Sequence, residues 1–355
     1  MRRLAALSTM IAGIAGVGLF HAAQARAAGG CSVASAPTIA SGTTQSANEN
    51  DCPGPDHYEY WALNLRIGDT LTVNATGTGL IGTGVDVYGP DVGTIGGTPE
   101  CGDGLFGPVQ VACLIPAAGR YVLAFHNATV SFTPTVKSVP PQAGRAAGAC
   151  DAANAPTVPA RVTEYSNANL CAGSGSYQYW AIDASRGDTL TVDVRTTEGG
   201  IGTALEVYGP NVRTINGKPL CSASEFGGAD QATCRIRAKG RYLIVSEKAT
   251  AVSFTPNVVH PTEIDIAAPR FVKGGGAIPI RVSIRSNTAS PLGTCIVQER
   301  LGSRWASVAT VRPKSGICNA SVPANRRGTV TLRVRFKGAK DWASSTSKPI
   351  AVVVT

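Results

Sequence analysis

Residues that usually carry catalysis are scarce in this sequence. Of its 355 residues only 4 are His, and Asp, Glu, Lys and Arg together make up 15%. The motifs G-x-S-x-G and H-E-x-x-H and a phosphate-binding glycine loop are all absent as usable motifs. Because a catalytic set needs a base, an activated nucleophile or a metal, we expect a protein that is not an enzyme and holds no cofactor.

Long apolar runs are also missing, with one exception at the N-terminus. Arg2 and Arg3 precede a mostly apolar run from Leu4 to Phe20, and small residues typical of a cleavage site follow as far as Ala27. We therefore expect a signal peptide over residues 1–28. The mature protein would then be secreted or held at the cell surface, with no transmembrane span.

A lipid anchor is the alternative at this end of the chain. Cys31 follows three small residues, but the large aliphatic residue that such signals carry three places before the cysteine is missing. Cys150, which matches Cys31 in the internal repeat described next, has similar small neighbours and cannot be a new N-terminus. Secretion without a lipid is therefore favoured.

Hydrophobic residues make up 43% of the chain, which is too many for a disordered protein. The 41 Gly, 22 Pro and only 2 Met, together with runs of Val, Thr and Ile, are typical of a turn-rich all-β protein. The length allows two or three cores of ordinary domain size.

The chain contains an internal repeat. The stretch from Tyr58 to Val73 recurs from Tyr177 to Val192, and in each copy apolar and polar residues alternate on both sides of a Gly-Asp turn. This is the pattern of a β-hairpin with one buried face. We expect two copies of one domain over residues 29–137 and 150–261, a Pro-, Ala- and Gly-containing linker over 138–149, and a third, different unit over 262–355.

Three landmarks in each copy resemble a known family. In the first copy they are Tyr60-Trp61 with the following Gly-Asp turn, Asp86-Val87-Tyr88-Gly89-Pro90 and Gly119-Arg120-Tyr121-Val122-Leu123. This set resembles the bacterial pre-peptidase C-terminal (PPC-like) domain family. The resemblance implies a jelly-roll β-sandwich that accompanies secreted enzymes and is implicated in polymer or surface binding. Some relatives bind calcium through acidic residues, but Asp56 and Asp86 of the first copy become Gly175 and Glu206 in the second.

The third unit carries a different resemblance. Its segment from Leu332 to Ser347 is similar to the closing strands of bacterial immunoglobulin-like (Ig-like) repeats, and residues 278–284 alternate in the manner of a strand with one buried face. Together these patterns predict an all-β protein with three β-sandwich domains, namely two repeated jelly-roll-like sandwiches and one Ig-like sandwich.

Ten cysteines in a chain of this kind predict disulfides, and C-x2-4-C pairs of the kind that zinc sites need are absent. Each copy holds four cysteines and the third unit holds two, so local pairing is expected. The predicted bonds are Cys31–Cys52, Cys101–Cys113, Cys150–Cys171, Cys221–Cys234 and Cys295–Cys318.

Aromatic and adhesion-like motifs are candidate binding sites in the repeats. Tyr58 and Tyr60, and likewise Tyr177 and Tyr179, share one face of a strand and are candidates for stacking on sugar rings. Because both faces of these strands are apolar, we favour packing in the core over binding. The second copy also spells Arg-Gly-Asp (186–188), but the first has Ile-Gly-Asp at the same place, so the motif is explained by the turn.

Charge is distributed unevenly along the chain. Residues 29–141 contain 3 Lys and Arg against 9 Asp and Glu, whereas residues 262–355 contain 15 against 4. The outward strand positions of the third unit carry a set of cations that would favour an anionic cell-wall polymer or glycan. With no aromatic side chain expected among them, we expect no specific nucleic-acid binding. A merely solvated face is the alternative. The predicted binding cations are Arg281, Arg285, Arg333, Arg335 and Lys337.

Three functions remain open on these grounds. The first is a secreted, non-catalytic binding or adhesion protein of a bacterial cell envelope, held electrostatically by its third unit. The second is a structural or protein-partner module that associates through the acidic first copy and the basic third unit. The third is a set of accessory domains in an extracellular enzyme system.

Overall fold

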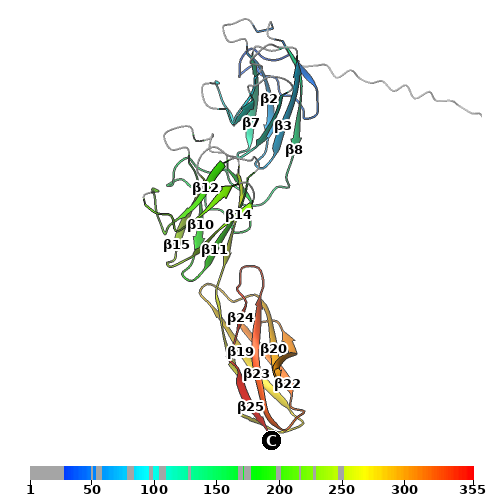
Figure 1. The fold of residues 1–355 in the computed structure, drawn as a ribbon, viewed down its shortest axis with the longest axis vertical. Helices are drawn as coiled ribbons and strands as arrows, with labels where there is room; N and C mark the ends of the chain where they lie inside the picture. The colour runs from blue at the N-terminus through cyan, green and yellow to red at the C-terminus, as the bar shows by residue number, and fades with distance from the viewer. Residues whose placement is uncertain are drawn as a thin grey trace, which may run out of the picture.

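The fold is all-β, as predicted. A computed structural model describes residues 28–48, 51–52, 58–77, 84–95, 99–103, 109–126, 129–166, 171, 177–196, 201–215, 217–226, 229–246 and 252–355. These residues form strands, turns and loops, and the strands gather in three groups that follow one another along an elongated molecule (Figure 1). Nearly all of the expected signal peptide lies outside the described residues. In the part of the chain that is described, no helix is long and apolar enough to cross a membrane.

The first group of strands forms two antiparallel sheets that enclose a core. Their orders are β2-β7-β4-β5 and β1-β8-β3-β6. Alternation along β2 directs Trp61 into this core, where its ring meets the edge of Phe132 at a centroid distance of 4.8 Å. The strands are β1 (Gln45–Ala47), β2 (Tyr58–Leu65), β3 (Thr70–Gly77), β4 (Gly84–Tyr88), β5 (Cys101–Asp103), β6 (Val109–Leu114), β7 (Gly119–His126) and β8 (Val130–Lys137).

The second group repeats this arrangement strand for strand. Its sheets have the orders β10-β15-β12-β13 and β14-β11-β16-β9, and Trp180 packs on Phe254 where the first group has Trp61 and Phe132. The strands are β9 (Glu164–Ser166), β10 (Gln178–Ala184), β11 (Thr189–Thr196), β12 (Ile201–Tyr208), β13 (Cys221–Phe226), β14 (Ala229–Arg235), β15 (Gly240–Ser246) and β16 (Val252–Val259).

The repeated Tyr-Gly-Pro and Gly-Arg-Tyr motifs meet in the structure, which explains why both recur. A side chain at Gly89 would put its Cβ 2.3 Å from the ring of Tyr121. The backbone after β4 therefore packs against this buried ring only because residue 89 is glycine. The Tyr121 hydroxyl donates to the Ala117 carbonyl (2.9 Å). The Arg120 guanidinium donates to the carbonyls of Val33 and Ala36, both at 3.0 Å. These motif residues are therefore scaffold.

The third group forms a three-stranded sheet, β17-β19-β22, facing a six-stranded sheet in which β18-β25-β23-β20-β21 are joined by β24 next to β23. Ile278, Ile280, Val282 and Ile284 all point into the core between them, as the alternation predicted. The strands are β17 (Thr262–Ala267), β18 (Phe271–Val272), β19 (Ala277–Ser286), β20 (Gly293–Leu301), β21 (Arg304–Val311), β22 (Ile317–Pro323), β23 (Gly328–Gly338), β24 (Ser345–Thr346) and β25 (Ile350–Val354).

All five predicted disulfides are present. In each group one of them joins the two facing sheets: β5 to β6, β13 to β14, and β20 to β22. The other two fasten the segment that precedes β1 or β9. The bonded pairs are Cys31–Cys52, Cys101–Cys113, Cys150–Cys171, Cys221–Cys234 and Cys295–Cys318.

Candidate functional site

The five predicted binding cations lie on two opposite sides of the third group. Arg281 and Arg285 belong to β19 in the three-stranded sheet, and the other three belong to β23 in the six-stranded sheet. Because the two sheets face each other across the core, their outer faces point in opposite directions. Strand alternation predicts which residues point outward, but it does not predict which sheet a strand joins. The five residues therefore do not form one surface.

Acidic neighbours largely neutralise the β19 side. Arg285 is ion-paired with Asp265 of β17. Glu263 lies directly opposite Arg285 in the register of the two strands. Arg281 has Ala267 and Asn319 as its cross-strand neighbours. This side offers little net charge to an anionic ligand.

The outer face of the sheet that contains β23 carries a row of cations. Arg333, Arg335 and Lys337 follow one another at every second position of the strand, so their side chains share the outer face. Arg335 and Lys337 are exposed. Arg300, also exposed, lies opposite Trp305 on the neighbouring hairpin of β20 and β21. We call Arg300, Trp305, Arg333, Arg335 and Lys337 the cationic face.

Arg333 is held in place on this face. Its guanidinium lies 4.1 Å from the centre of the Trp305 ring, and its Nε donates to the amide oxygen of Gln298 at 2.9 Å. A cation over an aromatic face and a hydrogen bond together reduce the conformational freedom of a long side chain. The expectation that no aromatic residue lies among these cations is therefore wrong. Trp305 is 28 positions away in sequence, and only the pairing of β21, β20 and β23 brings the two together.

No acidic residue of the third group lies on the cationic face. Glu263 and Asp265 belong to the opposite sheet. Glu299 pairs with the inward-facing Leu332 and lies 3.8 Å from Arg326. The fourth, Asp341, accepts from Arg161 of the second group at 2.9 Å. Residues 252–355 are all described, so this account covers the whole group.

The predicted tyrosines lie in two separate groups of strands, under the segments that precede β1 and β9. Tyr60 and Tyr179 are only 7% and 8% exposed, whereas Tyr58 and Tyr177 are half-buried. Backbone hydrogen bonds between Gly30 and Tyr60 lay the N-terminal segment across this outer face. The strand is thus covered on both sides, as its two apolar faces indicated, and little ring surface is left for a ligand.

A small polar cluster adjoins the first of these tyrosine pairs. The Tyr88 hydroxyl donates to Asp86 Oδ2 at 3.4 Å, and the His126 ring lies 5.3 Å from the Tyr58 ring. Burial raises the pKa of Asp86, and nearby His126 partly opposes this. Burial and then the Asp86 charge raise the pKa of Tyr88 to about 12. Asp56 and His57, which precede β2 in the sequence, lie outside the described residues. Among those described, no three His, Cys, Asp or Glu side chains gather as a metal site would require.

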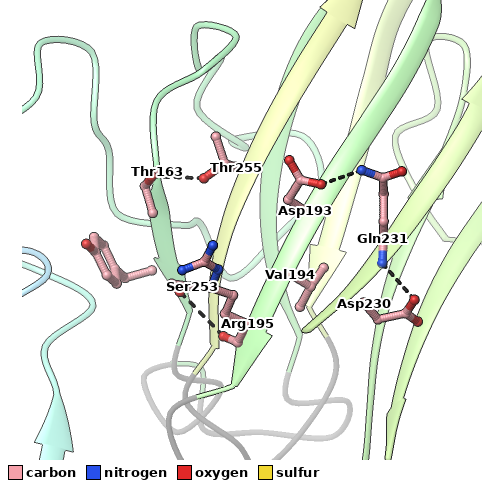
Figure 2. Close-up of a pocket in the computed structure, with 9 residues that line it drawn as sticks. Thr163, Asp193, Val194, Arg195, Asp230, Gln231, Ser253 and Thr255 are labelled. Carbon is pink, nitrogen blue, oxygen red and sulfur yellow. Dashed lines mark hydrogen bonds between the residues drawn. The ribbon is translucent and has the colours of Figure 1, made fainter. Parts of the chain in front are cut away.

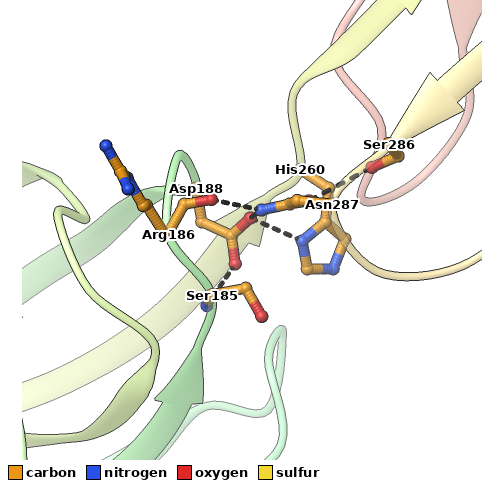
Figure 3. A network of polar contacts seen from close by, with 6 residues as sticks. All are labelled: Ser185, Arg186, Asp188, His260, Ser286 and Asn287. Atoms are coloured by element: carbon orange, nitrogen blue, oxygen red, sulfur yellow. Dashed lines mark hydrogen bonds and ion pairs between the residues drawn. The ribbon is translucent and has the colours of Figure 1, made fainter.

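The Arg-Gly-Asp tripeptide lies in the joint between the second and third groups (Figure 3). The Asp188 side chain is 0% exposed, and its Oδ1 is 2.8 Å from both His260 Nδ1 and Asn287 Nδ2. Asn287 Nδ2 also donates to the Arg186 carbonyl at 2.6 Å. With its carboxylate enclosed, the tripeptide cannot present the acid that an adhesion receptor would need. The sequence indicated a turn, but it did not indicate that the turn is a joint.

Comparisons with known proteins add no assignment. No protein-family model matches the chain, and neither does any curated protein. One solved structure that is matched is the glycoside hydrolase domain of Endo-D from Streptococcus pneumoniae R6, at 9% sequence identity and a TM-score of 0.20. The match covers 50% of this chain and 31% of that one. A likeness of this size supports no statement about fold or activity.

Proposed function

We propose that the chain is a secreted, non-catalytic binding protein of a bacterial cell envelope that holds an anionic polymer on the cationic face. The observation that carries this proposal is the set of cations aligned along β23 with no acidic residue beside them. The repeats, which resemble PPC-like domains, would act as spacers that place this face at the far end of the molecule. Five disulfides are consistent with an extracellular protein.

The geometry suits a linear polyanion. Alternate residues of a strand are about 6.7 Å apart, so three cations present a straight row about 13 Å long. A polymer with anionic groups along its length can contact several of them at once, whereas a single small anion meets only one or two. Arg333, held by Trp305, needs little further ordering on binding, which lowers the entropy cost.

A pair of double variants tests the proposal on the full chain. Arg335→Gln with Lys337→Gln removes two charges from the cationic face, and Arg281→Gln with Arg285→Gln removes the same charge from the opposite sheet. Exposed ion pairs contribute about 0.2–1 kcal/mol each, so the first variant should bind polyphosphate or heparin about 2- to 30-fold more weakly. The matched control should bind as the wild type does.

Salt provides the second readout. Because exposed charges are screened within about 8 Å at physiological ionic strength and more strongly above it, binding should decline steeply between 50 and 500 mM salt. Equal losses in the two variants, or binding that ignores salt, would contradict a defined cationic face. Sedimentation at the same two salt concentrations tests the alternative function, a module that associates with itself or a protein partner. Oligomers that dissociate at high salt would favour contact between the acidic first copy and the basic third unit.

A further inference from the structure

A second surface, remote from the cationic face, has the chemistry of a sugar site. The outer face of the sheet β14-β11-β16-β9 carries an open cavity of about 710 Å³ (Figure 2). This size lies within the range usual for small-molecule sites. Its polar lining comes from four strands or their approaches and includes Thr163, Asp193, Arg195, Asp230, Gln231 and Thr255.

Part of this lining is a frame that both copies share. Thr163 and Thr255 are joined through their hydroxyls at 2.9 Å, and in the first copy Thr44 and Thr133 are joined in the same way at 2.9 Å. The Gln231 amide donates to Asp193, and the Gln110 amide donates to Asn74 at the matching place. These cross-strand pairs fix side chains on a rigid sheet, which is a better support for a site than a loop.

The rest of the lining is specific to the second copy. Where the second copy has Asp193, Arg195 and Asp230, the first has Asn74, Thr76 and Val109 (matched by their places in the strand pairing). Tyr165, at the wall of the cavity, matches Ser46. The shared positions thus keep the frame, and the changed positions add two carboxylates and a guanidinium, while the Tyr165 ring is mostly buried against Ile67 and Val139.

These groups favour one class of ligand. Two carboxylates beside one guanidinium disfavour an anion, and the mainly polar lining disfavours an apolar molecule. Carboxylates accept and a guanidinium donates, while threonine and glutamine do both, so neighbouring hydroxyl groups of one ligand could all be satisfied at once. Hydrogen bonds to charged groups are also the strong ones. Among the residues the structure describes, the Arg195 guanidinium has no hydrogen-bond or ion-pair partner and is available to a ligand.

We propose that this cavity binds a neutral oligosaccharide, and that the second copy alone has this activity. The site goes beyond the cationic face in both place and chemistry. The same chain would then contact an envelope at two points, through a neutral glycan and through an anionic polymer.

The first copy supplies the variant that tests this. Asp193→Asn, Arg195→Thr and Asp230→Val together install residues that an equivalent frame already tolerates. The full chain is first probed on an array of neutral and acidic oligosaccharides, and the strongest neutral oligosaccharide is then titrated by calorimetry. We expect the triple variant to bind it at least 10-fold more weakly. Asn74→Ala with Thr76→Ala, at the matching face of the first copy, should leave binding unchanged.

Three results would overturn the proposal: no neutral oligosaccharide bound on the array, unchanged affinity in the triple variant, or an equal loss in the first-copy control. If the triple variant folds poorly by circular dichroism, Asp193→Asn alone replaces it and should still weaken binding. Binding in the cavity should also persist at 500 mM salt. This separates it from the cationic face, so that either proposal can fail without the other.

Discussion

A buried glutamate in the second copy should make the stability of that copy depend on pH. Glu164 on β9 is 0% exposed. Its Oε2 accepts from the Ala146 amide at 3.0 Å, while within the described residues its Oε1 has no hydrogen-bond partner. Burial raises the pKa of this carboxyl from the usual 4.5 to about 7, against smaller opposing effects of the Ala146 amide and the Arg145 charge. The charged form is therefore costly in the folded state.

The direction and size of this pH dependence follow from the linkage between protonation and folding. Because the folded state holds the proton more tightly than the unfolded state, Glu164 contributes its full stability below about pH 4.5 and loses it as the pH rises to about 7. A shift from 4.5 to about 7 corresponds to about 3 kcal/mol. For a unit of this size that is a fall in Tm of roughly 10 °C.

The first copy provides the test variant, because it has Gln45 where the second has Glu164. In Glu164→Gln the penalty disappears, so relative to the wild type the second copy should gain about 2–3 kcal/mol at pH 8 and less than 1 kcal/mol at pH 5. Differential scanning calorimetry at the two pH values measures this. The reverse change, Gln45→Glu, should introduce the same pH dependence into the first copy. If the Tm difference between Glu164→Gln and the wild type is the same at pH 5 and pH 8, burial of the charged carboxylate does not destabilise the folded state and the reasoning is refuted.

Two further predictions concern the third group. Asn287→Ala removes the two hydrogen bonds that Asn287 makes across the joint, to the Arg186 carbonyl and to Asp188, and leaves the Arg161–Asp341 ion pair in place. Small-angle scattering should therefore show a wider range of orientations, with the Tm of each group nearly unchanged; an unaltered scattering profile would contradict this. Cys295→Ala with Cys318→Ala opens a buried bond that spans 23 residues and should cost about 3 kcal/mol, measured as a lower Tm confined to the third group; a loss below 1 kcal/mol would contradict it.

Much of the fold could be predicted from the sequence because it depends on short-range patterns. Alternation in Tyr58–Leu65 predicts a strand with two apolar faces, and the number of cysteines in each unit predicts a nearby partner for each of them. The cationic face could not be predicted in the same way. Arg281 and Arg335 both occupy outward positions of alternating strands, and only the strand order places them on opposite sides. Trp305 meets Arg333 only through pairing that no local pattern encodes.

The Gly-Asp turn shows how an internal repeat can separate scaffold from function. Gly68 and Gly187 both have positive φ, so each turn needs glycine. Yet each turn also faces the next group of strands: a Cβ at Gly68 would lie 2.6 Å from the Tyr165 ring, and one at Gly187 would lie 3.3 Å from Pro261. The first joint is lined by apolar residues around Tyr165, whereas the second is polar around Asp188.

The same turn thus carries two different joints: Ile67 packs with Tyr165 in the first, whereas the Arg186 carbonyl and Asp188 bind Asn287 in the second. The second joint uses the Arg186 carbonyl and the carboxylate of Asp188, so the adhesion-like tripeptide is part of a joint between two groups of strands. The same comparison of the two copies leads to a different conclusion for the outer face of the sheet β14-β11-β16-β9. There Asp193, Arg195 and Asp230, which differ from the first copy, line an open cavity, which favours a ligand over a joint.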